Sequence, residues 1–152
     1  ESSQYKNITF LFLVSATVNP IPFNFQVADE YTQHFNHSVV CMHNLIHKTL
    51  QRKKKFQSIR IINVSSAMVN EPEPLTIFLP YLIGKIGLSA YLDNLNKELK
   101  ERKVEVVEIY ADYFDSNLNR SWPEYLKTKM RNNAKSALND TATLVINEMV
   151  KC

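Results

Sequence analysis

The stretch from residue 58 to residue 110 constrains the fold most. An apolar run at 59–64 is broken only by Arg60 and Asn63, and a second, valine-rich run occupies 104–110. Between them, residues 79–102 repeat apolar side chains at helical spacing. Two buried strands joined by a long helix form a parallel crossover, because a tight turn can join only antiparallel strands. The stretch therefore predicts a parallel sheet.

The remaining segments extend this pattern into one domain over residues 1–152. Residues 8–14 form another apolar run, typical of a strand covered on both faces. Asp29 is a plausible cap for a helix at 30–54, and Ser121 for a helix ending near 135. Residues 140–150 keep helical spacing, with an edge strand as the alternative. The predicted order is β-α-β-α-β-α-α, an α/β fold with a three-layer, partial Rossmann-like parallel sheet of about three strands.

Composition and charge exclude several classes of protein. The chain is 45% hydrophobic and 22% charged with a net charge of +3, which is typical of a soluble globular domain. No apolar run approaches the roughly 20 residues of a membrane span, and no signal peptide is recognisable, so we expect a cytoplasmic protein. Cys41 and Cys152 are expected to be reduced, and His43 and His47 lack further ligands for a metal.

The basic run at residues 52–55 has two interpretations. No aromatic side chains interleave with it as a base-stacking surface would require, so we expect no nucleic-acid partner. A solvated helix end is the simpler interpretation. A phosphate-binding or targeting patch is the alternative.

The glycine content limits cofactor binding. The chain has two glycines, Gly84 and Gly87, and both fall in the predicted helix at 79–102. Loops that bind phosphate use glycine because the backbone must approach the anion closely. If the protein binds a dinucleotide through its pyrophosphate, the turn that does so is expected to lie outside this chain.

Polar residues interrupt the apolar pattern at two places. Ser65 and Ser66 end the strand at 59–64, and Tyr81 lies four residues before Lys85 at the start of the helix. The two serines belong to the sequence N-V-S-S at 63–66, and the helix continues with Leu88 and leucines 95 and 99. With these features, residues 8–115 resemble the second half of a short-chain dehydrogenase/reductase.

The resemblance implies specific roles. Tyr81 would act as the acid or base, with the Lys85 ammonium lowering the pKa of its phenol. Ser66 would hold the substrate carbonyl or hydroxyl. Lys85 would also bind the nicotinamide ribose of NAD(P), and Asn36 would connect Lys85 to solvent through a water molecule. Each residue also has a purely structural interpretation, as a strand end, a helix-start aromatic or a surface polar group.

Two departures from the family pattern oppose activity. V-S-A-T at 14–17 stands where the family has N-N-A-G, and Ala111-Asp112 stands where it has P-G. A side chain where the backbone must approach a ligand obstructs it, and the Asp112 carboxylate could repel phosphates.

We therefore expect a degenerate short-chain dehydrogenase-like domain without cofactor binding, forming a homodimer or meeting a protein partner through its two long helices. The alternative is the catalytic half of an NAD(P)-dependent oxidoreductase for a carbonyl or alcohol substrate, with its nucleotide-binding half outside this chain. An unrelated flavodoxin-like or other α/β binding domain is a third possibility.

Overall fold

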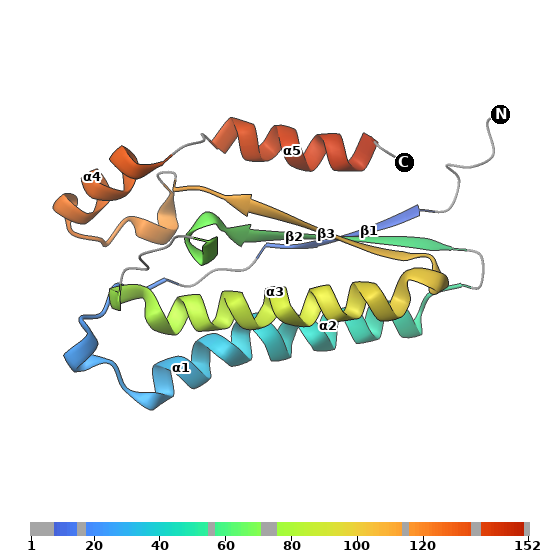
Figure 1. Ribbon diagram of the computed structural model, residues 1–152, viewed down its shortest axis with the longest axis horizontal. Helices are drawn as coiled ribbons and strands as arrows, with labels where there is room; N and C mark the ends of the chain where they lie inside the picture. Colours follow the sequence, from blue (N-terminus) through green and yellow to red (C-terminus); the bar gives the residue numbers. More distant parts are fainter. Residues whose placement is uncertain are drawn as a thin grey trace.

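The central element is a parallel sheet of three strands. The computed structural model describes residues 8–14, 18–54, 57–70, 76–113, 116–134 and 138–150. Within these, β1 (Ile8–Leu13), β2 (Ser58–Ser66) and β3 (Val104–Ala111) lie in the order β1-β2-β3, and both pairs are parallel (Figure 1). The predicted parallel crossover is confirmed.

Helices cover both faces of this sheet. One face carries α1 (Ala28–Phe35), which continues through a π-helical turn (Asn36–Val40) into α2 (Cys41–Gln51), and beside them α3 (Leu79–Leu99). The other face carries α5 (Leu138–Val150), and α4 (Glu124–Asn133) lies beyond one end of the sheet (Figure 1). The C-terminal segment is thus a helix, and the predicted three layers are confirmed.

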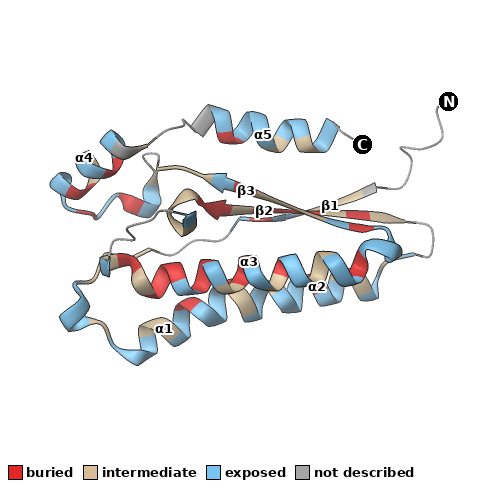
Figure 2. Ribbon diagram, in the orientation of Figure 1, coloured by how far each residue is buried: buried red, intermediate tan, exposed pale blue. Residues whose placement is uncertain are grey.

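Two apolar clusters fill the space between the helices and the sheet. The larger one joins β1, β2 and β3 to the inner sides of α2 and α3, and its members are Leu13, Ile46, Ile59, Ile61, Leu88, Leu92, Leu99 and Val104. The second cluster lies at the start of α3, beneath α4, and consists of Phe78, Tyr81, Leu82, Trp122, Leu126 and Met130. In Figure 2 the buried residues of α3 run along much of its length.

The first long helix differs from its prediction at the π-helical turn. In a regular helix over 30–54, Phe35 would lie on one apolar face with Tyr31, Val39 and Met42. Instead, Phe35 is 41% exposed, whereas His34 and Ser38 are buried against α3. A π-helical turn accommodates extra residues per turn and so changes which side chains face the sheet. At Gly84, α3 consequently packs against polar groups of this segment, namely the His34 carbonyl and the Ser38 hydroxyl.

Gly84 permits this close contact, and a substitution there should be costly. A Cβ at Gly84 would lie 2.8 Å from the His34 carbonyl oxygen and 2.9 Å from the Ser38 Oγ, and a backbone carbonyl cannot move aside easily. We expect Gly84→Ala to lower the free energy of unfolding by about 1–2 kcal/mol in urea titrations, despite alanine's higher helix propensity.

Gly87→Ala is the matched control for that substitution. Its Cβ would meet the ends of two side chains, Val39 at 3.2 Å and Phe35 at 3.3 Å, which can shift. The control should therefore be neutral or stabilising. Equal destabilisation by both substitutions would contradict the close contact at Gly84.

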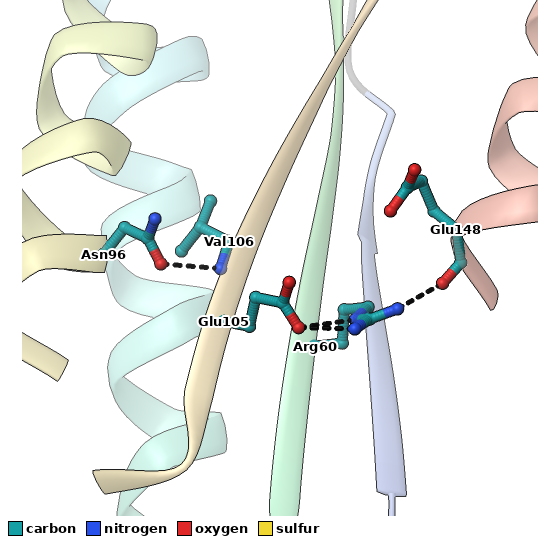
Figure 3. A network of polar contacts seen from close by, with 5 residues as sticks. All are labelled: Arg60, Asn96, Glu105, Val106 and Glu148. Carbon is teal, nitrogen blue, oxygen red and sulfur yellow. Dashed lines mark hydrogen bonds and ion pairs between the residues drawn. The ribbon is translucent and has the colours of Figure 1, made fainter. Parts of the chain in front are cut away.

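Arg60 links α5 to the sheet through hydrogen bonds. Its Nε and Nη2 donate to Glu105 Oε2 on the neighbouring strand, at 2.9 and 2.5 Å, and its Nη1 donates to the carbonyl of Glu148 in the last turn of α5 (Figure 3). On the other face of β3, Asn96 of α3 accepts a hydrogen bond from the Val106 amide at 3.0 Å. These polar contacts supplement the apolar contacts between the layers.

Candidate functional site

The structure brings three of the predicted site residues together. Ser66 is the last residue of β2 and lies beside Ala111, the last residue of β3. Tyr81 and Lys85 lie one turn apart near the start of α3, and their side chains line the same cavity as Ser66. Ser66, Tyr81 and Lys85 therefore converge near the carboxyl ends of β2 and β3.

Tyr81 is held in a buried position beside Ser66. Only 7% of the residue is exposed, and burial raises the pKa of its phenol, while a side-chain hydrogen bond with Ser66 lowers it in part. The direction is opposite to the expected effect of the Lys85 ammonium, because desolvation of the phenolate outweighs the other contributions. At neutral pH the phenol keeps its proton and can donate a hydrogen bond to an oxygen of a bound molecule.

Lys85 is a buried amine. It is 3% exposed, its Nζ lies 3.5 Å from the Val64 carbonyl oxygen, and the same atom is 5.8 Å from the centre of the Tyr81 ring. Burial lowers the pKa of the amine from 10.5 to about 8, and the charge of Glu108 opposes that shift in part. At pH 7 the amine is charged at a site where charge is costly.

Glu108 on β3 supplies the negative charge beside Lys85. Its Oε1 accepts hydrogen bonds from Asn63 Nδ2 at 2.8 Å and from Ser89 Oγ at 2.6 Å, and its Oε2 accepts one from the Tyr110 hydroxyl at 2.9 Å. Ser89 lies one turn after Lys85 on α3. This network, which joins β2, β3 and α3, was missed in the sequence, where Glu108 counts only as a polar residue in a valine-rich strand.

The structure does not bring Asn36 to this group. Asn36 is exposed and borders a hollow on the outer side of α1 and α2 with Asp29 and His37. Two residues later, Ser38 is buried against Gly84, and the buried His34 packs its ring edge against Tyr81 with ring centres 6.3 Å apart. The only sequence signal for these two residues is their four-residue spacing, which a regular helix pattern does not assign to the inner face.

The cavity is small and mostly apolar. Its volume is about 150 Å³, with the Ser66 and Tyr81 side chains on one side. Trp122 is fixed in the wall by a hydrogen bond from its Nε1 to the Val18 carbonyl at 3.3 Å, and by ring contacts with Phe78 and Tyr113. The other wall residues are Val14, Val18, Val64, Ser65, Ala67, Met68, Lys85, Ala111, Asp112, Ser116, Leu118, Asn119 and Met130. Such a cavity suits a small apolar molecule that carries one oxygen.

Comparison with known families settles the ancestry of this arrangement. Residues 2–127 match the family of short chain dehydrogenases. The chain belongs to the short-chain dehydrogenase/reductase family. A direct comparison with curated protein sequences gives no match.

Solved structures of short-chain dehydrogenases/reductases share the fold at low identity. A 4-hydroxyisoleucine dehydrogenase mutant complexed with NADH and succinate superposes with a TM-score of 0.69 at 15% identity, over 80% of this chain and 50% of that one. The angucycline C-6 ketoreductase LanV with bound NADP superposes with a TM-score of 0.65 at 17% identity, over 80% of this chain and 46% of that one. A short chain dehydrogenase from Burkholderia cenocepacia J2315 in complex with NADP superposes with a TM-score of 0.63 at 17% identity, over 76% of this chain and 48% of that one. The chain spans about half the length of these structures.

The residues around the cavity depart from the family pattern at positions that would approach a dinucleotide. Neither glycine of the chain lines the cavity, and Ala111 and Asp112 place side chains in its wall where the family has proline and glycine. Asp112 also accepts a hydrogen bond from the amide of Tyr113 at 2.9 Å, which uses part of its carboxylate. The V-S-A-T departure at 14–17 lies largely outside the described residues.

Two further expectations concern membranes and metals. None of the described helices combines the length and the apolar composition that a membrane span requires. Within the described part of the chain, His, Cys, Asp and Glu side chains form no group of three that could hold a metal ion. His43 and His47 instead stack with ring centres 5.8 Å apart, and His43 Nδ1 shares a hydrogen bond with the Tyr91 hydroxyl at 3.0 Å.

Proposed function

We propose that this chain is a degenerate short-chain dehydrogenase/reductase domain that does not bind NAD(P) and serves as a dimerisation module. The partner is a second copy of the chain, docked through the outer face of the helix layer formed by α1, α2 and α3. The observation that carries the proposal is a set of large apolar side chains exposed on that layer.

Three of these side chains form one patch, here called the helix-layer patch: Phe35, Ile83 and Ile86. They are 41%, 44% and 50% exposed. Ile83 and Ile86 lie one turn apart on α3, and Phe35 of α1 lies 3.3 Å from where a Cβ at Gly87 would be, next to them. Val40 and Leu45, on the same helical segment as Phe35, are 42% and 43% exposed. Contiguous exposed apolar surface of this kind marks an interaction site.

A second copy fits this patch because a two-fold contact needs only a surface that complements itself. Ala90 is a small, exposed residue on α3 one turn after Ile86, so it would let the helix of a second copy approach closely. Burying the three side chains in a dimer would remove the apolar surface from water, which is the main driving force for association.

Two properties of the cavity support the loss of catalysis. The Tyr81 phenol has a raised pKa, so it lacks the acidity that a proton-transfer residue needs near neutral pH. The side chains of Ala111 and Asp112 occupy the wall that a nicotinamide would approach. The buried site residues then contribute to the fold and no longer to chemistry.

Light scattering of the 152-residue chain tests the dimer. We expect a dimer in the wild type and at least a thirtyfold weaker association for Ile86→Asp, because a charge replaces an apolar side chain near the centre of the contact. The matched control is Ile146→Asp on α5, whose side chain is 57% exposed on the opposite face, and it should leave the dimer intact. A monomeric wild type at all accessible concentrations would defeat the proposal.

A second candidate function is the catalytic half of an NAD(P)-dependent oxidoreductase. The assembled Ser66, Tyr81 and Lys85 cluster favours it, since these three residues line one cavity and the resemblance assigns them the substrate, proton-transfer and ribose contacts. NAD(P)H fluorescence titration of the full-length protein decides between the two. Saturable binding that Lys85→Ala abolishes would establish the second candidate, and no binding would support the first.

A further inference from the structure

The end of the sheet opposite the cavity gathers positive charge. α2 ends at Gln51 and α3 at Leu99, and β2 and β3 begin shortly after each of them, so both connections lie at the amino ends of the strands (Figure 1). The Ile59 amide, near the start of β2, donates to the Lys103 carbonyl at 3.0 Å and joins β2 to the connection between α3 and β3. We call the side chains of residues 52–54 and 97–103 the basic pole.

The basic pole has more positive charge than it can neutralise internally. Residues 52–54 and 97–103 contain seven Lys or Arg and two Glu, whereas the whole chain has a net charge of only +3. Among the described residues, Lys97 is the one member with an ion pair, to Asp93 at 2.5 Å. Most of the other cations are exposed. The basic run noted in the sequence therefore continues onto a second segment that the fold brings beside it.

A groove of about 650 Å³ opens within this pole. Its charged lining comprises Arg60, Lys97, Lys100 and Lys103, with the carboxylates of Asp93 and Glu105. Asp93 is paired with Lys97, and Glu105 with Arg60 at 2.5 Å. Lys100 and Lys103 thus remain as excess positive charge on the groove, next to the hydrogen-bonding side chains of Ser58 and Asn96.

Lys103 occupies a position that glycine normally takes. Its φ is 57°, the single left-handed non-glycine residue in the described part of the chain. A side chain in this conformation is strained, and helices commonly end on glycine here for that reason. A lysine in this strained conformation supports the hypothesis that its charge has a function.

We propose that the basic pole docks on an anionic membrane surface, with Lys100 and Lys103 contacting phosphorylated lipid headgroups over the groove. Neither segment of the pole contains an aromatic residue that could stack on a base, which disfavours nucleic acid. Residues 52–54 do not line the groove, so a small phosphorylated molecule bound there would leave their charges unused, whereas a membrane surface contacts both segments of the pole. Clusters of four to eight Lys or Arg are typical of surfaces that bind anionic lipids.

Co-sedimentation of the full 152-residue chain with vesicles tests the proposal. We expect binding to phosphatidylcholine vesicles that contain phosphatidylinositol bisphosphate, weakening as salt rises, and none to phosphatidylcholine alone. The double variant Lys100→Ala/Lys103→Gly should bind about thirtyfold more weakly, from the loss of two charges near the surface. Because glycine suits the left-handed position, this variant should keep the wild-type thermal midpoint or exceed it.

The matched control is Arg120→Ala/Lys129→Ala, which removes the same charge from exposed positions near α4. It should retain vesicle binding within about twofold, since these residues lie beyond a Debye length from the pole. Equal losses in the two double variants would overturn the proposal in favour of a non-specific charge effect. So would equally tight binding of free tripolyphosphate or of duplex DNA, which would make the membrane unnecessary.

Discussion

Phe78→Ala is expected to lower the free energy of unfolding by about 3–5 kcal/mol, the largest effect of any single truncation considered. Phe78 is fully buried directly before α3, and its ring lies 5.0 Å from that of Trp122. Removing it leaves a cavity among Tyr81, Leu82 and Trp122, and the first two cannot close in fully because α3 fixes their backbones. The same truncation loosens the wall of the functional cavity.

Urea unfolding followed by Trp122 fluorescence measures this effect, since Trp122 is the only tryptophan and lies against the deleted ring. Phe25→Ala is the control, because Phe25 is 73% exposed and its loss should change the free energy by less than about 0.5 kcal/mol. A loss below about 1 kcal/mol for Phe78→Ala would show that the second apolar cluster is not packed as described.

Lys85→Met is expected to stabilise the protein at pH 7 by about 3 kcal/mol, and this advantage should disappear as the pH rises from 8 to 10.5. Burial lowers the folded-state pKa of Lys85 from 10.5 to about 8. Each pKa unit corresponds to about 1.4 kcal/mol. Methionine has a similar shape and carries no charge to bury.

The sign follows from proton binding. Between pH 8 and 10.5 the unfolded chain keeps the proton on Lys85 and the folded chain has lost it. The free energy of unfolding of the wild type therefore increases as the pH rises through this window. Below pH 8 both states hold the proton, and the full penalty applies. The measurement is the difference between wild-type and Lys85→Met unfolding free energies from pH 7 to 10.5, which cancels other titrating groups.

Lys129→Met serves as the control for that series, since Lys129 is exposed on α4 and the substitution removes a charge that is not buried. A difference for Lys85→Met that does not change with pH would mean that the amine reaches solvent in the folded state. It would also remove the reason for treating Lys85 as a buried group of the candidate site.

The local pattern was sufficient to predict the main elements and the three-residue cluster. Residues 59–64 and 104–110 could be assigned to buried strands because both faces of a parallel strand are covered, which leaves an almost continuous apolar run. Tyr81 and Lys85 could be placed together because helical residues four apart share a face. Ser66 could be added because the carboxyl ends of neighbouring parallel strands meet at one edge of the sheet.

The surroundings of that cluster could not be predicted in the same way. Asn36 was expected beside Lys85, but the π-helical turn at 36–40 leaves it exposed and turns His34 and Ser38 inward. The pKa of Tyr81 is raised where the sequence suggested a lowered value, because the extent of desolvation depends on Phe78 and Trp122 packing around the ring. Each of these depends on contacts between segments far apart in the chain.

The sequence by itself determined a parallel α/β domain of about three strands that resembles the second half of a short-chain dehydrogenase/reductase, with a serine at the end of one strand and a tyrosine and a lysine at the start of the following helix. Periodicity and motif spacing are local properties, and they are sufficient for that. Only the tertiary structure decided how far the site is shielded from water and that Glu108 supplies its counter-charge. It also decided that residues 52–54 and 97–103 lie at the same end of the sheet. Burial and electrostatic interaction depend on distances through space, and those are set when the layers pack together.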